Sequence, residues 1–336
     1  MTRGSSTTLF TVCTCVVFAI AAVAAHGEPS QVTVATVQFR VEEATYSSVG
    51  AYRAAVERVV ERAVDHYDAD IIVFPEYLNV FLIASRFPEA VEQASTVEEA
   101  AHLAVGRPGD GGDRRATGLP ALLRSAAAKT AGQAIGIWQE LAASYEVTIV
   151  AGTFFVPPEE PHEPGLRNRL IVFDRTGEIL YEQDKVYLTE EERRDLGIRP
   201  GSLAEAEPVE LAGITAGFTI CRDSFFDSWH EPLDDIEVWF DLRANGEPFS
   251  REVEERFRRT LPRRVRDAQA DAGVNATLTG SFLDLLWEGR SYIVDDSGRR
   301  VAESRRVAGT EITAVTLIAR GDSWQLERRG PQNGRP

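Results

Sequence analysis

Short stretches along the chain place apolar residues at alternating or continuous positions, a pattern typical of half-buried and fully buried β-strands. The first of them, residues 31–40 (QVTVATVQFR), alternates and is rich in valine and threonine. The same reading predicts strands at residues 71–74, 147–155, 170–173, 179–184, 209–211, 214–220, 236–242, 275–282, 290–295, 300–304 and 311–319. Turn residues at 175–178 (RTGE) and 212–213 (AG) predict two β-hairpins.

Other stretches carry apolar residues at helical spacing. Residues 48–65 show this period, and helices are also expected at 89–105, 118–145 and 251–272, the last kinked by Pro262. Strands and helices alternate without a long linker or an internal repeat. The pattern therefore predicts one α/β domain over residues 31–319, with helices covering its sheets, followed by a polar, frayed tail at 321–336.

The N-terminus has a different character from the rest of the chain. Residues 9–25 carry no charge, are mostly apolar and end in small residues. This indicates a secretory signal over residues 1–25, cleaved near Ala24 or Ala25, with an uncleaved membrane anchor as the alternative. The mature protein would then be exported, periplasmic or extracellular, and would keep Cys221 as its one cysteine, so no intramolecular disulfide is expected.

Composition narrows the range of partners and draws attention to the rare lysines. The 336-residue chain has a formal net charge of −16, which disfavours nucleic acid and anionic membrane surfaces as partners. Its histidines and cysteines form no metal-binding pattern, so neither a metal nor an organic cofactor is expected. Only two of the 36 basic residues are lysine, Lys129 and Lys185. Lysine is a compact point charge, whereas arginine is a broad fork, so a retained lysine is a candidate for chemistry.

Three chemically suited residues follow predicted strands. Glu76 comes after the buried run 71–75 (IIVFP), Lys185 after strand 179–184, and Cys221 after strand 214–220. Sites in α/β folds assemble at the carboxyl ends of strands. We therefore expect an acid, an amine and a thiol to converge in one pocket.

The segments around these residues carry a resemblance to a known family. They are residues 32–39 (VTVATVQF), 73–77 (VFPEY), 184–189 (DKVYLT), 217–223 (GFTICRD) and 289–291 (GRS) with the following 292–298. In this order the chain resembles the nitrilase, or carbon–nitrogen hydrolase, superfamily. The resemblance implies a four-layer αββα sandwich, assembly as a homodimer or larger homo-oligomer, and a Glu76–Lys185–Cys221 catalytic triad. It also implies a second glutamate after the lysine, for which Glu190, Glu191 and Glu192 compete and the spacing favours Glu192.

The activity implied is that of an exported, amidase-type hydrolase of non-peptide carbon–nitrogen bonds in small-molecule amides. Cys221 would form an acyl thioester, Glu76 would act as the base, Lys185 would stabilise the oxyanion, and Glu192 would position Lys185 or the substrate nitrogen. Nitrilases typically have Cys-Trp-Glu where this chain has Cys-Arg-Asp, which disfavours a nitrile-hydrolysing enzyme. That activity, an N-acyltransferase of the same superfamily and a non-catalytic binding protein on this fold are the alternatives.

Replacing Lys185 by arginine should abolish turnover of any accepted amide while the protein remains folded. A compact donor must sit about 3 Å from the oxyanion, and a displacement of about 1 Å can lower the rate roughly 100-fold. The guanidinium would also form a bidentate pair with Glu76 and withdraw the base. Turnover assays with circular dichroism test this, with Lys129→Arg as the silent control. Near-normal turnover by a folded Lys185→Arg variant would contradict the assigned role.

Overall fold

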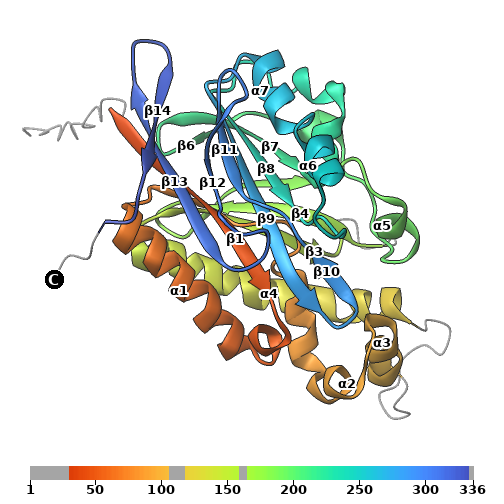
Figure 1. Ribbon diagram of the computed structural model, residues 1–336. Helices are drawn as coiled ribbons and strands as arrows, with labels where there is room; N and C mark the ends of the chain where they lie inside the picture. Colours follow the sequence, from red (N-terminus) through yellow and green to blue (C-terminus); the bar gives the residue numbers. More distant parts are fainter. Residues whose placement is uncertain (1–29, 106–117, 159–164, 333–336) are drawn as a thin grey trace, which may run out of the picture.

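Two β-sheets pack face to face, and helices cover the outer face of each sheet (Figure 1). The computed structural model describes residues 30–105, 118–158 and 165–332. The expected signal segment, residues 1–25, lies outside the described residues. Among the described helices, none combines the length and the apolar character needed to cross a bilayer.

The order of strands defines the two sheets. The first sheet runs β14 (Trp324–Arg329), β13 (Glu311–Ala319), β1 (Gln31–Val41), β2 (Ile71–Val73), β3 (Thr148–Val156), β4 (Arg167–Phe173) and β5 (Ile179–Asp184). The second runs β12 (Arg300–Glu303), β11 (Tyr292–Asp295), β9 (Ala272–Phe282), β8 (Val238–Arg243), β7 (Ile214–Ile220) and β6 (Val209–Leu211). A short strand, β10 (Leu285–Trp287), forms a hairpin with β9. Parallel pairing of β1 with β9 joins the sheets and nearly closes them into a barrel.

Strand direction places several carboxyl ends together. Strands β1, β2 and β3 are parallel, and the hairpin of β4 and β5 returns β5 to their direction. Strands β7, β8 and β9 are also parallel to one another, and β9 is parallel to β1. The loops that follow β2, β5, β7 and β8 therefore leave the sandwich at the same end.

Strand β1 shows why the sequence builds four layers. Its side chains alternate: Val32 and Val34 pack between the sheets, whereas Ala35 and Val37 pack toward α1 (Val49–Tyr67) and α4 (Leu119–Tyr145). The outer face of the second sheet is covered in the same way by α7 (Leu261–Ala268), with α6 (Arg251–Phe257) preceding it (Figure 1). The predicted single-domain αββα sandwich is confirmed.

Two long helices that the sequence predicted are each divided. Residues 89–105 form α2 (Pro88–Gln93) and α3 (Val97–Val105), because the Thr96 hydroxyl accepts a hydrogen bond from the Glu99 backbone and starts a new helix. Residues 251–272 form α6 and α7, and Pro262 lies in the first turn of α7 rather than at a kink. Strand β9 begins at Ala272, where the helix was expected to end.

The expectation of a frayed C-terminal tail is wrong for part of it. Residues Trp324–Arg329 form β14, which pairs antiparallel with β13 at the edge of the first sheet. Trp324 is buried against the core between the sheets, and this contact anchors an otherwise polar strand. The remaining short elements are α5 (Glu190–Arg194) and the 3-10 turns Glu43–Tyr46, Val80–Arg86, Leu203–Glu205, Cys221–Phe225 and Asp227–His230.

The loop that follows β2 is held by a fully bonded asparagine. The Asn79 amide donates to the carbonyl oxygens of Ala151 and Thr153, at 2.7 and 3.1 Å. Its Oδ1 accepts from the Tyr52 hydroxyl at 2.5 Å and from the Trp138 indole at 2.7 Å. Because each of these partners belongs to a helix or strand, the loop after β2 has a fixed position on β3.

Gly152 makes this close approach of loop and strand possible. It has a φ of +77°, and a Cβ there would overlap the carbonyl oxygen of Pro75, the residue before Glu76. Glycine is the residue that tolerates both the left-handed backbone and the contact. The position of Glu76 therefore depends on residue 152 having no side chain.

Gly152→Ala should lower the free energy of unfolding by roughly 2–4 kcal/mol, since backbone strain and overpacking each cost about 1–3 kcal/mol. Gly136→Ala in α4 is the control, because a Cβ there meets nothing within 4 Å. That substitution should stabilise the helix by about 0.5–1 kcal/mol. Urea denaturation of both variants tests the pair, and equal effects of the two substitutions would contradict this account of Gly152.

Candidate active site

Glu76 lies at the carboxyl end of β2 and is completely buried. One carboxylate oxygen, Oε1, accepts hydrogen bonds from Lys185 Nζ at 2.7 Å and from Asn168 Nδ2 at 2.9 Å. The other, Oε2, accepts from the backbone N–H of Ala244 at 3.1 Å, in the loop after β8. The carboxylate thus joins loops from both sheets.

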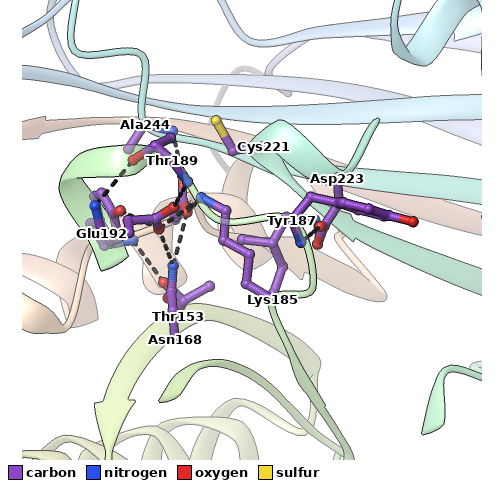
Figure 2. A network of polar contacts seen from close by, with 12 residues as sticks. Thr153, Asn168, Lys185, Tyr187, Thr189, Glu192, Cys221, Asp223 and Ala244 are labelled. Atoms are coloured by element: carbon purple, nitrogen blue, oxygen red, sulfur yellow. Dashed lines mark hydrogen bonds and ion pairs between the residues drawn. The ribbon is translucent and has the colours of Figure 1, made fainter. Parts of the chain in front are cut away.

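Lys185 and Glu192, both labelled in Figure 2, complete a buried charge cluster with Glu76. Lys185 Nζ donates to Glu192 Oε1 at 2.8 Å, and the Tyr77 hydroxyl donates to the same oxygen at 2.5 Å. Glu192 Oε2 accepts from the backbone N–H of Thr189 and so also caps helix α5. This cluster holds two carboxylates and one ammonium, all about 99 % excluded from solvent.

Of the three glutamates that the sequence left open, Glu192 is the one beside the lysine. Glu190, in the same helix, is exposed and pairs with Arg194 on the surface. The side chain of Glu192 points inward because its capping bond to Thr189 fixes the orientation of the first turn. The structure therefore brings Glu76, Lys185 and Glu192 together.

Cys221 lies on the turn that ends β7, next to this cluster (Figure 2). Its φ is +51°, a left-handed conformation that is uncommon for a residue with a Cβ. Tyr77, the residue after Glu76, has a φ of +64°. Such strain persists where the surrounding structure enforces it, and it clusters at functional sites. No hydrogen bond among the described residues joins the thiol to Glu76 or Lys185.

The charges around the site shift its pKa values in different directions. Burial raises the pKa of Glu76 to about 7, against the lowering effect of Lys185. Burial alone would raise the pKa of Glu192, but the adjacent Lys185 ammonium lowers it below its usual range. Burial would lower the pKa of Lys185, yet the two carboxylates raise it well above normal. At neutral pH the lysine is therefore a cation, and Glu76 is poised between its two forms.

Burial and the same charges also shift the pKa of the Cys221 thiol. Desolvation of the sulfur raises its pKa, and the negative charge of Glu76 raises it further. Lys185 and the buried Arg243 act in the opposite direction. Cys221 thus rests as a neutral thiol at neutral pH. The residue remains partly accessible to solvent.

Two residues that sequence reasoning missed hold the site in place. Asn168 Nδ2 donates to both Glu76 and Glu192, the latter at 3.2 Å. Asp223 is buried two residues after Cys221, and it accepts from the backbone N–H groups of Tyr187 at 2.7 Å and Ile220 at 3.3 Å. It therefore ties the loop after Lys185 to the turn of Cys221. Burial raises the pKa of Asp223 to about 8 despite these bonds.

The arrangement brings a carboxylate, a fixed cation and a thiol to one place (Figure 2). A carboxylate with a pKa near 7 is suited to general acid–base work, and an ammonium held in a dry site stabilises developing negative charge. Within the part of the chain that the structure describes, no group of three histidine, cysteine, aspartate or glutamate side chains could hold a metal ion.

Comparison with known proteins assigns the chain to a family. The sequence profile described as carbon–nitrogen hydrolase matches residues 33–322. The chain therefore belongs to the carbon–nitrogen hydrolase family, within the nitrilase superfamily. No curated protein sequence matches the chain.

Solved structures share the fold at low sequence identity. A carbon–nitrogen hydrolase from Helicobacter pylori G27 has 13 % identity and a TM-score of 0.61, over 85 % of this chain and 89 % of its own. Saccharomyces cerevisiae Nit3, a branch 10 member of the nitrilase superfamily, has 17 % identity and a TM-score of 0.58, over 86 % and 90 %. A mutant amidase from Nesterenkonia sp. AN1 has 15 % identity and a TM-score of 0.59, over 87 % and 94 %.

Proposed function

We propose that this protein is an amidase-type hydrolase that cleaves carbon–nitrogen bonds other than peptide bonds in small-molecule amides. One observation carries the proposal: a buried lysine is shared by two glutamates beside a cysteine on a strained strand-end turn. The charge cluster would be a costly arrangement for packing alone, since burying ions in a folded protein costs several kcal/mol each. The cluster is explained if Lys185 stabilises negative charge that develops during a reaction.

In the first half of the reaction Cys221 acquires the acyl group. Glu76 takes the proton from the thiol, and the thiolate attacks the amide carbonyl carbon. The carbonyl electrons move to oxygen, where Lys185 and the backbone N–H of Arg222 stabilise the oxyanion. As the carbon–nitrogen bond breaks, Glu76 returns the proton to the departing nitrogen. An acyl thioester and a free amine result.

The second half releases the acid. Glu76 takes a proton from water, and the hydroxide adds to the thioester carbon. The carbon–sulfur bond then breaks, and the proton on Glu76 returns to the sulfur. Glu192 keeps Lys185 in position throughout and does not itself exchange a proton. Hydrogen bonds such as that between thiol and base are commonly long without substrate, which fits the absence of such a bond here.

The similar amidase from Nesterenkonia sp. AN1 supports a nucleophilic cysteine, because its structure shows acrylamide added to the active-site cysteine. Export after removal of residues 1–25 and assembly as a homo-oligomer belong to the same proposal. The first rests on the apolar N-terminal run and the second on the superfamily resemblance.

Incubation with a panel of primary amides, followed by acid quenching and mass spectrometry, should detect an acyl adduct on the peptide that contains Cys221. Cys221→Ala should show neither adduct nor turnover. Glu76→Gln should lower turnover by more than about 100-fold, the lower range of general-base effects. Nitriles and an added amine acceptor test the alternative activities. Hydrolysis that survives Cys221→Ala, or no reaction with any amide, would overturn the proposal.

The pH profile of kcat/KM should rise through about pH 7 and level above it, because Glu76 must be ionised to accept the thiol proton and its pKa is about 7. Asn168→Ala removes a hydrogen bond that lowers the pKa of Glu76, so the midpoint should move to higher pH. Gln93→Ala, on the surface of α2, should leave it in place. A midpoint that Asn168→Ala does not move, or moves downward, contradicts this role of Asn168.

A further inference from the structure

An apolar cavity of about 140 Å³ lies beside the candidate active site. Its walls come from the 3-10 turn Val80–Arg86, from α3 and α4, and from the β9–β10 hairpin. Phe81, Leu122, Phe155 and Trp287 are among the side chains that line it. Among the described residues that line it, none is charged.

Tyr77 connects the cavity with the charge cluster. Tyr77 lines the cavity, and its ring packs edge-on against Phe155, with ring centroids 5.8 Å apart. Its hydroxyl donates to Glu192, and Lys185 Nζ lies 5.8 Å from the ring centroid. A carbonyl group bound at Lys185 would therefore have its substituent within reach of this ring.

Trp287 provides a second connection. A Cβ on Gly246 would stand 4.0 Å from the indole Nε1 of Trp287, and Gly246 is two residues beyond Ala244. Ala244 is the residue whose backbone N–H holds Glu76. The cavity is thus bounded by Tyr77, which bonds Glu192, and by Trp287, which lies near the loop that carries Ala244.

The volume and the lining together define what fits. An apolar cavity of about 150 Å³ in another protein stays dry and binds benzene. A cavity of 140 Å³ accordingly suits a phenyl ring or a short alkyl chain. Water would find few polar partners there, so an apolar group that enters gains the free energy of leaving water.

We propose that this cavity binds the acyl portion of the substrate, so that the enzyme acts on amides of apolar aliphatic or arylalkyl acids in preference to amides of small or charged acids. This inference rests on the proposed function, since it assigns the substrate class of the same site. Tyr77 then contacts both the substrate and the charge cluster, with its ring against the acyl group and its hydroxyl on Glu192.

A chain-length series tests the proposal. Each buried methylene contributes about a threefold to fourfold preference, so kcat/KM should rise roughly 100-fold from acetamide to hexanamide. Phenylpropanamide should be accepted, and succinamate, which carries a charge, should be rejected. The gain should stop once the chain exceeds the cavity.

Two substitutions in α3 distinguish an effect of the cavity on substrate preference from a general effect of altering the helix. Ala101 is buried and lines the cavity, so Ala101→Leu should reduce the ratio of kcat/KM for hexanamide over acetamide at least about tenfold. Ala104 lies in the same helix but does not line the cavity, and Ala104→Leu should leave the ratio unchanged. Should Ala101→Leu fail to fold, Phe87→Ala, which enlarges the cavity, should shift the preferred chain to a longer one.

The outcomes distinguish this inference from the proposed function. If the wild type hydrolyses no amide and forms no adduct on Cys221, the proposed function fails and the inference with it. If amides are hydrolysed but kcat/KM is flat with chain length, or if Ala101→Leu leaves the ratio and Phe87→Ala leaves the preferred chain length unchanged, the cavity assignment alone is overturned. A steep rise with chain length, a ratio lowered by Ala101→Leu but not by Ala104→Leu, and a longer preferred chain in Phe87→Ala support it.

Discussion

The ammonium of Lys185, shared between two buried carboxylates, is the interaction on which the site depends. Three charges lie out of contact with water, and their sum is negative whenever Glu76 is ionised. Burial disfavours the ionised form of Glu76, and a single cation does not fully offset two anions at this depth, so the pKa of Glu76 rises to about 7 while that of Glu192 falls. The unequal split arises because Glu192 has more partners, Tyr77 and Thr189 among them. One carboxylate therefore stays ionised beside the lysine, and the other can gain or lose a proton near neutral pH.

The architecture supplies these partners from distant parts of the chain. Strands β2, β5, β7 and β8 end at the same edge of the sandwich, so their loops meet although they are far apart in sequence. Backbone strain then sets the final positions, since Tyr77 and Cys221 both adopt left-handed conformations. Asn79 and Asp223 hold the strained loops by hydrogen bonds, and Gly152 allows the loop of Glu76 to lie against β3. The energy that the sandwich gains by burying its two sheets is large enough to maintain this local strain.

The sequence predicts those features of the fold and the site that depend on rare residue types or on periodicity. Lys185 and Cys221 stand out because the chain has so few lysines and cysteines, and Glu76 follows an unmistakable buried strand. The four layers follow from the alternation of strands and helices, together with the superfamily resemblance. Glu192 could not be identified from its residue type, because it is one of three consecutive glutamates that differ only in which of them faces inward.

Other features carry weak signals. Asn168 and Asp223 are ordinary residues in a strand and a loop, and their roles arise from contacts with segments distant in sequence. The start of α3 at Thr96 had a local signal, a threonine followed three residues later by glutamate, but apolar periodicity on both sides concealed it. Strand β14 is mostly polar because it is an edge strand, with Trp324 its one buried residue. Periodicity detects buried faces, and an edge strand presents little of one.

The buried charge cluster and the apolar cavity meet at Tyr77. Its hydroxyl bonds Glu192 in the cluster, and the residue also lines the cavity, so the cluster and an apolar ligand would share this side chain. A substrate that fills the cavity would keep water from the cluster while its carbonyl lies at Lys185. Because electrostatic interactions strengthen as water leaves, binding of the acyl group and stabilisation of the oxyanion would reinforce each other. A charged acyl group would lose both effects, since it would remain solvated and hold water at the site.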